Sequence, residues 1–103
     1  MGVFKDLQTD IEEYCRHLTA QHQARFPTLY REYEYEVGSK YVHIISRDTN
    51  QRFSHSFVVV KPDNKFAFGD ILKSAGWKKP ATNFKRGSVL SEEQYKHISW
   101  AGI

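Results

Sequence analysis

The sequence predicts an α+β fold: an N-terminal amphipathic helix packed on a four- to five-stranded antiparallel sheet, with a long ordered basic loop near the C-terminus. Three observations support this prediction: a helical period before Pro27, a period-two alternation after it, and turn-forming clusters between short β-rich runs. With 103 residues, 40% of them hydrophobic, the chain is expected to form a single domain over residues 1–103 that needs neither a metal nor a disulfide.

Apolar residues recur at spacings of three and four from Val3 to about Gln23. They are Phe4, Leu7, Ile11, Tyr14, Cys15 and Leu18. This spacing predicts a helix with one buried face. Because Pro27 disfavours helical backbone at the residue before it, the helix is expected to end near residue 24.

Residues 29–37 alternate between apolar and acidic side chains, which predicts a half-buried strand. One face carries Tyr33, Tyr35 and Val37, and the other carries Glu32, Glu34 and Glu36. The pair Gly38-Ser39 is expected to form the following turn.

Residues 40–47 and 52–60 are rich in β-forming side chains and are separated by turn formers, so they predict a hairpin. With its tip at Thr49-Asn50, the register sets Arg47 opposite Arg52, Ile45 opposite Ser54 and Ile44 opposite His55. The face expected to pack under the helix carries Val42, Ile44, Phe53, His55, Phe57 and Val59. The face expected to meet solvent carries Tyr41, His43, Arg47, Arg52, Ser54 and Ser56.

The two opposed arginines of this register are unfavourable by up to about 1 kcal/mol without a counterion. Either the register is wrong or this face of the hairpin meets something negatively charged.

The C-terminal third is less regular. Residues 66–68 are expected to form a short strand, and residues 71–75 form either a helical turn capped by Asp70 or a strand. Residues 76–87 lack any period, and a loop of this length in a compact domain is often functional. Ser91 and Gln94 have the form of a capping box and predict a short helix, followed by an alternating stretch over residues 95–100.

Charge is unevenly distributed. Residues 1–37 carry four basic and seven acidic side chains, a formal charge of −3, whereas residues 38–103 carry eleven basic and five acidic ones, a charge of +6. The stretch from residue 71 to 91 contains five cations and no acidic residue. This asymmetry favours an anionic partner for the C-terminal half, the alternative being a solvated basic loop.

Two aromatic residues, Trp77 and Phe84, are interleaved with these cations, the combination that single-stranded nucleic acid requires for base stacking and phosphate contact. The candidate nucleic-acid or anion-binding residues are Lys73, Trp77, Lys78, Lys79, Phe84, Lys85 and Arg86, extended by Arg47 and Arg52 of the hairpin. The alternative is that the two aromatic side chains anchor the loop to the core.

The sequence favours a non-enzymatic protein with no catalytic residue, metal or cofactor. His17 and His22 do not share a helix face, and His43 and His55 point to opposite faces of the hairpin, so no histidine pair has metal-ligand spacing. His55 is more typical of a hydrogen-bonded structural residue, and Cys15 of a packing residue. Phosphate-binding glycine motifs are absent from the sequence.

The stretch from Phe68 to Ala81, FGDILKSAGWKKPA, followed by Arg86-Gly87, resembles a signature of small uncharacterised proteins of tailed bacteriophages. The similarity extends upstream to the strand at residues 52–58 and covers about half of the chain. It implies a phage origin and expression in the cytoplasm of a bacterial host, and it transfers no catalytic residue.

Two further functions remain open. One is a protein-binding accessory factor that modulates a host enzyme or a defence complex through Glu32, Glu34 and Glu36 or through the basic loop. The other is a homo-oligomer that holds a small anionic ligand between subunits. The longest apolar run, residues 57–60, is far shorter than a membrane span, so a cytoplasmic protein without a membrane partner is expected.

Overall fold

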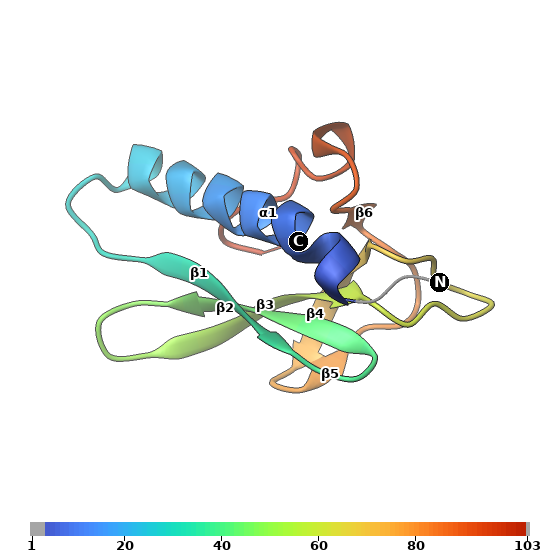
Figure 1. The fold of residues 1–103 in the computed structure, drawn as a ribbon. Coiled ribbons are helices and arrows are strands. Elements are labelled where there is room, and N and C mark those ends of the chain that lie inside the picture. The colour runs from blue at the N-terminus through green and yellow to red at the C-terminus, as the bar shows by residue number, and fades with distance from the viewer. Residues whose placement is uncertain (1–3, 103) are drawn as a thin grey trace.

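The computed structural model describes residues 4–102 and shows one helix lying across one face of an antiparallel sheet (Figure 1). The elements are α1 (Phe4–Arg25), β1 (Glu32–Val37), β2 (Tyr41–Arg47), β3 (Arg52–Val59), β4 (Asp70–Gly76), β5 (Lys79–Pro80), β6 (Gly87–Ser88) and the 3₁₀ turn η1 (Glu92–Gln94). The α+β fold class is confirmed. Val3, where the predicted helical pattern begins, lies outside the described residues.

Helix α1 ends where the sequence indicated. The Phe26 N–H donates the last helical hydrogen bond to the His22 carbonyl at 2.8 Å, and Pro27 prevents a further turn. The buried face contains Leu7, Ile11, Tyr14, Cys15, Leu18 and His22. Over residues 4–102, no helix has both the length and the apolar character that a membrane crossing requires.

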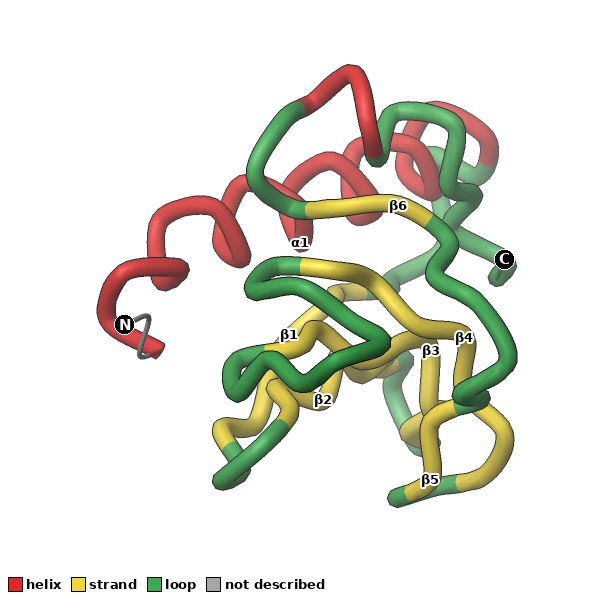
Figure 2. The backbone as a smooth tube through the Cα atoms, turned by 90° about the vertical axis from the view of Figure 1, so that its right-hand side faces the viewer, coloured by secondary structure: helices red, strands yellow, loops and turns green. Residues whose placement is uncertain are grey.

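The sheet has the order β1-β2-β3-β4, and both short strands, β5 and β6, pair with the outer edge of β4. Residues 71–75 are therefore strand, which decides between the two alternatives. The expected irregular loop is also partly wrong, because its ends form β5 and β6. Between them the Ala81 and Arg86 N–H groups donate to the carbonyls of Lys73 and Ile71, each at 2.7 Å, so the segment follows β4 (Figure 2).

The register of the β2–β3 hairpin is confirmed at its tip and wrong beyond it. Arg47 pairs with Arg52 and Ile45 with Ser54, but Ile44 pairs with Ser56. A β-bulge inserts His55 as an extra residue, so every later pair is shifted by one position.

The bulge also corrects the assignment of the two faces. Ser56, expected in solvent, is fully buried on the α1 side, where its Oγ lies 3.0 Å from the Tyr14 hydroxyl. Phe57 and Val59, expected under the helix, belong to a separate cluster with Phe66 and Leu72 on the opposite face. The remaining residue expected in the core, Phe53, is 43% exposed.

The main core lies between α1 and the sheet. Its buried members are Leu7, Ile11, Tyr14, Cys15, Leu18, Tyr33, Val42, Ile44, Val58, Val60, Ile71, Val89, Tyr95 and Ile98. The last three come from the segment after β6, which closes the side of the core that α1 and the sheet leave open (Figure 1).

In the C-terminal third, the short strand at residues 66–68 is wrong, and the short helix after Ser91 is confirmed without its expected capping bond. Residues 66–67 have no regular structure and residue 68 begins a turn, so no strand forms there. The helix there is the single 3₁₀ turn η1, and Ser91 accepts from the Gln94 N–H through its main-chain carbonyl and not through its side chain. Residues 95–100 form turns that close on a bridge between Ser99 and Gly102, so their alternation does not produce a strand.

Candidate nucleic-acid interface

Trp77 lies at the tip of the hairpin that joins β4 to β5. Gly76 pairs with Lys79, so Trp77 and Lys78 form a two-residue turn. The indole meets the His43 ring edge to face, with centroids 4.9 Å apart, yet remains 41% exposed. Trp77 is therefore fixed on one side and open to solvent on the other, unlike a buried loop anchor.

His43, which supports Trp77, is itself held from several sides. Its ring stacks on Phe57 with centroids 4.4 Å apart and 3° between the planes. Its Nε2 lies 2.7 Å from the Ser54 Oγ, which lies 2.6 Å from the Ser74 Oγ. This chain of polar groups joins β2, β3 and β4 directly beneath the turn that carries Trp77.

Burial lowers the pKa of His43 below its ordinary value of 6.5. The neighbouring Glu36 carboxylate raises this pKa, while the charges of Arg52 and Lys78 lower it further. Because the net direction is downward, His43 is neutral near pH 7 and acts there as an aromatic and hydrogen-bonding group rather than as a cation.

The two opposed arginines at the hairpin tip have counterions on β1. Arg52 Nη2 lies 2.7 Å from Glu36 Oε2, and Arg47 Nη1 lies 3.9 Å from Glu34 Oε1. The negative charge that the register required is thus supplied by the alternating glutamates of the same sheet. The Arg52 guanidinium also lies 5.4 Å from the Trp77 ring centroid, within the range of a cation–π contact.

A groove of about 390 Å³ opens at the turn between β1 and β2 and reaches Lys78 of the Trp77 turn. The rings of Tyr41, His43 and Phe57 line it, and the Lys78 side chain lies at its border. Lys78 and Lys79 are exposed and make no ion pair with any residue in the described part of the chain. We call the set of Trp77, Lys78, Lys79, Arg52 and the three groove rings the Trp77 surface.

A second group of candidate residues lies beside the start of β4, at the other end of that strand from Trp77. Phe84 is 54% exposed, and the Arg86 guanidinium lies 4.1 Å from its ring centroid. Lys85 Nζ lies 3.6 Å from the buried Asp70 carboxylate, so part of its charge is already balanced.

Lys73 is separated from both groups. It pairs with Ser56, whose side chain points toward α1, so Lys73 belongs to the helix face of the sheet. The structure therefore brings Trp77, Lys78, Lys79 and Arg52 together, with Arg47 next to Arg52, and it sets Lys73 and residues 84–86 apart.

Sequence reasoning missed the residues that support Trp77. Ser54 and His43 were correctly placed on one face, but that face was expected to meet solvent and His43 is buried. Nothing in the sequence indicated that the two bond to each other or that Ser54 bonds to Ser74. Phe57 was assigned to the wrong face because the bulge at His55 leaves no trace in the alternation.

His55 and Cys15, the two residues weighed for catalysis, are both buried. His55 is buried, with Nε2 2.9 Å from the Ser99 carbonyl oxygen and Nδ1 2.9 Å from the Ser56 Oγ. Burial raises the pKa of the Cys15 thiol to about 12, which keeps it protonated. Within residues 4–102, no three His, Cys, Asp or Glu side chains are arranged to hold a metal ion.

The fold and this site define a small helix-on-sheet domain that presents an aromatic and basic surface on the sheet face opposite α1. A model described as a family of unknown function (DUF7717) matches residues 1–103, and the chain belongs to this family. Comparisons with curated proteins and with solved structures gave no match.

Proposed function

We propose that this protein binds single-stranded nucleic acid through the Trp77 surface, without catalysing a reaction. The observation that carries the proposal is the exposed indole, held edge to face by His43 and flanked by Arg52 and two unpaired lysines. A base stacked on an exposed aromatic side chain contributes about 1 to 3 kcal/mol, whichever base it is. In the groove, the partly exposed Tyr41 ring offers a further aromatic surface for a neighbouring base, while His43 and Phe57 are buried.

The proposed electrostatic contribution comes mainly from Lys78 and Lys79. Arg47 and Arg52 are bound to glutamates, so a phosphate gains less from them than from a free cation. With two to four phosphates neutralised, the logarithm of the binding constant is expected to fall with the logarithm of salt concentration with a slope of roughly −1.4 to −2.8.

The cellular setting is part of the proposal. The similarity of residues 68–87 to a signature of tailed-phage proteins supports an accessory protein that acts in the cytoplasm of a bacterial host. Host nucleic acid and phage nucleic acid are then both available as partners.

A second candidate function is a protein-binding modulator of a host enzyme or defence complex. The free outer edge of β1, at the end of the sheet order, favours it, because an unpaired edge strand is a common docking element for another chain.

Fluorescence anisotropy tests the nucleic-acid proposal, with labelled 12-nucleotide DNA, the same RNA sequence and a DNA duplex, each at 50 and 200 mM salt. We expect single strands to bind, higher salt to weaken binding, and both Trp77→Ala and Lys78→Ala/Lys79→Ala to weaken it further.

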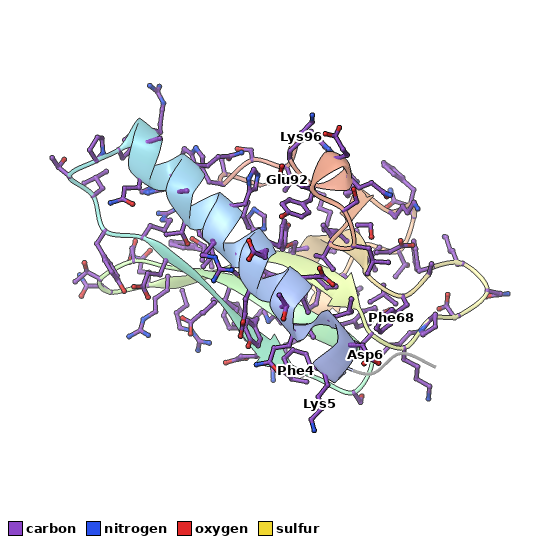
Figure 3. The ribbon with its side chains drawn as sticks, turned by 45° about the horizontal axis from the view of Figure 1, so that its top comes forward. Phe4, Lys5, Asp6, Phe68, Glu92 and Lys96 are labelled. Carbon is purple, nitrogen blue, oxygen red and sulfur yellow. The ribbon has the colours of Figure 1, made fainter. Side chains whose placement is uncertain are left out.

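The matched control is Lys5→Ala/Lys96→Ala, which removes the same charge from the helix side of the molecule (Figure 3). If both double variants lose the same binding affinity, the effect of Lys78→Ala/Lys79→Ala depends only on the net charge of the protein. Absence of binding to all three nucleic acids at 50 mM salt would contradict the proposal.

A further inference from the structure

The outer edge of β1 carries unpaired backbone groups. Gly38 N–H donates to the Tyr41 carbonyl at 2.9 Å, which places the even-numbered residues of this strand in the ladder with β2. The odd-numbered residues Tyr33, Tyr35 and Val37 therefore direct their N–H and C=O groups away from the sheet. The Tyr33 N–H confirms the alternation, because it donates outward to the Thr19 Oγ1 at 3.2 Å.

The Thr19 hydroxyl occupies only the first of these outward donors. No group within residues 4–102 is hydrogen-bonded to the outward N–H groups of Tyr35 and Val37. An edge with consecutive free donors and acceptors of this kind accepts an added strand.

A groove of about 690 Å³ runs between this edge and α1. Its helix side extends from Glu12 to Gln23, and its strand side comprises residues 32–35. Eleven helical steps span about 16 Å, the length of about five residues of extended chain. The groove is thus long enough for a short added strand.

The charges that line the groove indicate which kind of ligand can bind there. Glu12 and Glu32 line it and make no ion pair with any described residue, while its one cation, Arg16, is bound to Glu13. The groove is therefore locally negative on a chain whose formal net charge is +3. Phosphate-bearing ligands are disfavoured there, and basic ones are attracted.

A second copy of the chain is also disfavoured. If two β1 edges paired antiparallel through their outward residues, the glutamates of one strand would lie directly opposite those of the other, for example Glu34 opposite Glu36. Like charges in directly opposed positions destabilise a strand pair.

We propose that the β1 edge binds an extended segment of a partner protein in which Lys or Arg alternates with apolar residues. The segment adds as a further antiparallel strand, with its basic side chains beside the glutamates and its apolar side chains in the groove beside Tyr33 and Tyr35. This inference is independent of the nucleic-acid proposal. It gives the second candidate function a location and a partner chemistry.

Peptide titration followed by amide NMR tests the inference on the full chain. The probe is the acetylated and amidated heptapeptide Lys-Val-Lys-Val-Lys-Val-Lys. Its valines lie on the Tyr35 side of the added strand, so valine N–H groups make the bonds to β1. We expect slowed hydrogen exchange at the Tyr35 and Val37 amides, and no binding by a peptide with the valine nitrogens methylated or with Glu in place of Lys.

A pair of matched variants separates this site from general electrostatics. Glu32→Lys is expected to weaken binding of the lysine peptide by about threefold to tenfold, because an attractive cross-strand pair becomes repulsive. Glu92→Lys makes the same charge change at η1 and is expected to leave binding unchanged (Figure 3).

Three results would overturn the inference: equal binding of the methylated peptide, unchanged exchange at Tyr35 and Val37 while the peptide binds, or no binding. Protection of these amides by single-stranded DNA would also overturn it, since the occupant would then be nucleic acid. If single-stranded DNA affects Trp77 but not the Tyr35 and Val37 amides, the result supports two separate sites.

Discussion

The indole of Trp77 and the imidazole of His43 meet edge to face with ring centroids 4.9 Å apart and 74° between their planes. Burial keeps His43 neutral near pH 7, and its stacking on Phe57 fixes its plane. The orientation of the exposed indole is thus set before any ligand arrives. A preoriented stacking surface loses little conformational entropy on binding.

Removal of the Trp77 ring is expected to weaken nucleic-acid binding strongly while lowering the unfolding free energy only a little. Trp77→Ala should weaken single-strand binding by about fivefold to 150-fold, which corresponds to the 1 to 3 kcal/mol of one stacked base. Its cost in unfolding free energy is expected to be smaller than that of a buried aromatic residue, because the side chain is 41% exposed. Anisotropy titration and urea unfolding measure the two effects. Trp77→Phe, which keeps a stacking face, should retain most of the binding.

The unfolding free energy is expected to fall as pH is lowered below about 6.5. Burial lowers the pKa of His55, so the folded state binds fewer protons than the unfolded state, whose histidines titrate near 6.5. Stability from this group is fully present above pH 6.5 and is lost as pH falls toward the folded-state pKa. Urea unfolding at pH 7.5 and pH 5.5 measures the difference.

His55→Gln should reduce this pH dependence, and the part that remains comes from His22 and His43, whose pKa values are also lowered by burial. An identical pH dependence in the variant would show that His55 is not the group responsible.

Gly87 is expected to resist substitution because of a close backbone approach. A Cβ at this position would lie 2.2 Å from the Gln94 carbonyl oxygen, so η1 would have to move. Gly87→Ala should cost about 1 to 3 kcal/mol of unfolding free energy. Gly76→Ala is the matched control, since the nearest atom to its added Cβ is 3.7 Å away, and its cost should stay within about 0.5 kcal/mol. Equal effects in thermal unfolding would contradict this explanation.

Substitution of Asp70 is expected to cost more unfolding free energy than substitution of its partner Lys85. Asp70 is 4% exposed and its Oδ2 accepts from the Ala67 N–H at 2.9 Å. Asp70→Ala leaves that donor unpaired and should cost about 1 to 3 kcal/mol of unfolding free energy. Lys85→Ala should cost less than about 1 kcal/mol, because the lysine side chain is exposed. Urea unfolding of both variants checks the order.

These two sites also explain several residues of the stretch from Phe68 to Gly87. Gly69 adopts a positive φ of 90°, Asp70 bonds back to Ala67, and Gly87 permits the approach of η1. Gly69, Asp70 and Gly87 therefore serve the fold, whereas Gly76 has no such requirement. Trp77 and Lys78, which are exposed, have no comparable structural requirement.

Local patterns were sufficient for much of the fold. The helical spacing before Pro27 and the Tyr/Glu alternation of β1 each report one buried face, and the turn formers at residues 48–51 fixed the hairpin tip. The run from Phe57 to Val60 is buried on both faces of the sheet, so its periodicity carries no information on orientation. The extra residue at His55 then reversed the assignment of the residues that followed it.

The candidate site was predictable in composition but not in arrangement. Interleaved aromatic and basic residues indicated Trp77, Lys78 and Lys79. The grouping of these residues with Arg52 depends on a two-residue turn and on pairing between β3 and β4, which are contacts between distant segments. The same pairing sends Lys73 to the opposite face of the sheet, a separation that charge counting along the chain does not detect.

The most direct test of the central proposal follows the two indole N–H signals of the protein by ¹H–¹⁵N NMR during titration with an eight-nucleotide oligothymidylate. Trp100 serves as an internal control, because it packs on His22 and Phe26 beside α1. The account predicts that the Trp77 signal shifts in a saturable manner while the Trp100 signal stays in place. An unchanged Trp77 signal at millimolar oligonucleotide, or a shift of Trp100 alone, would contradict it.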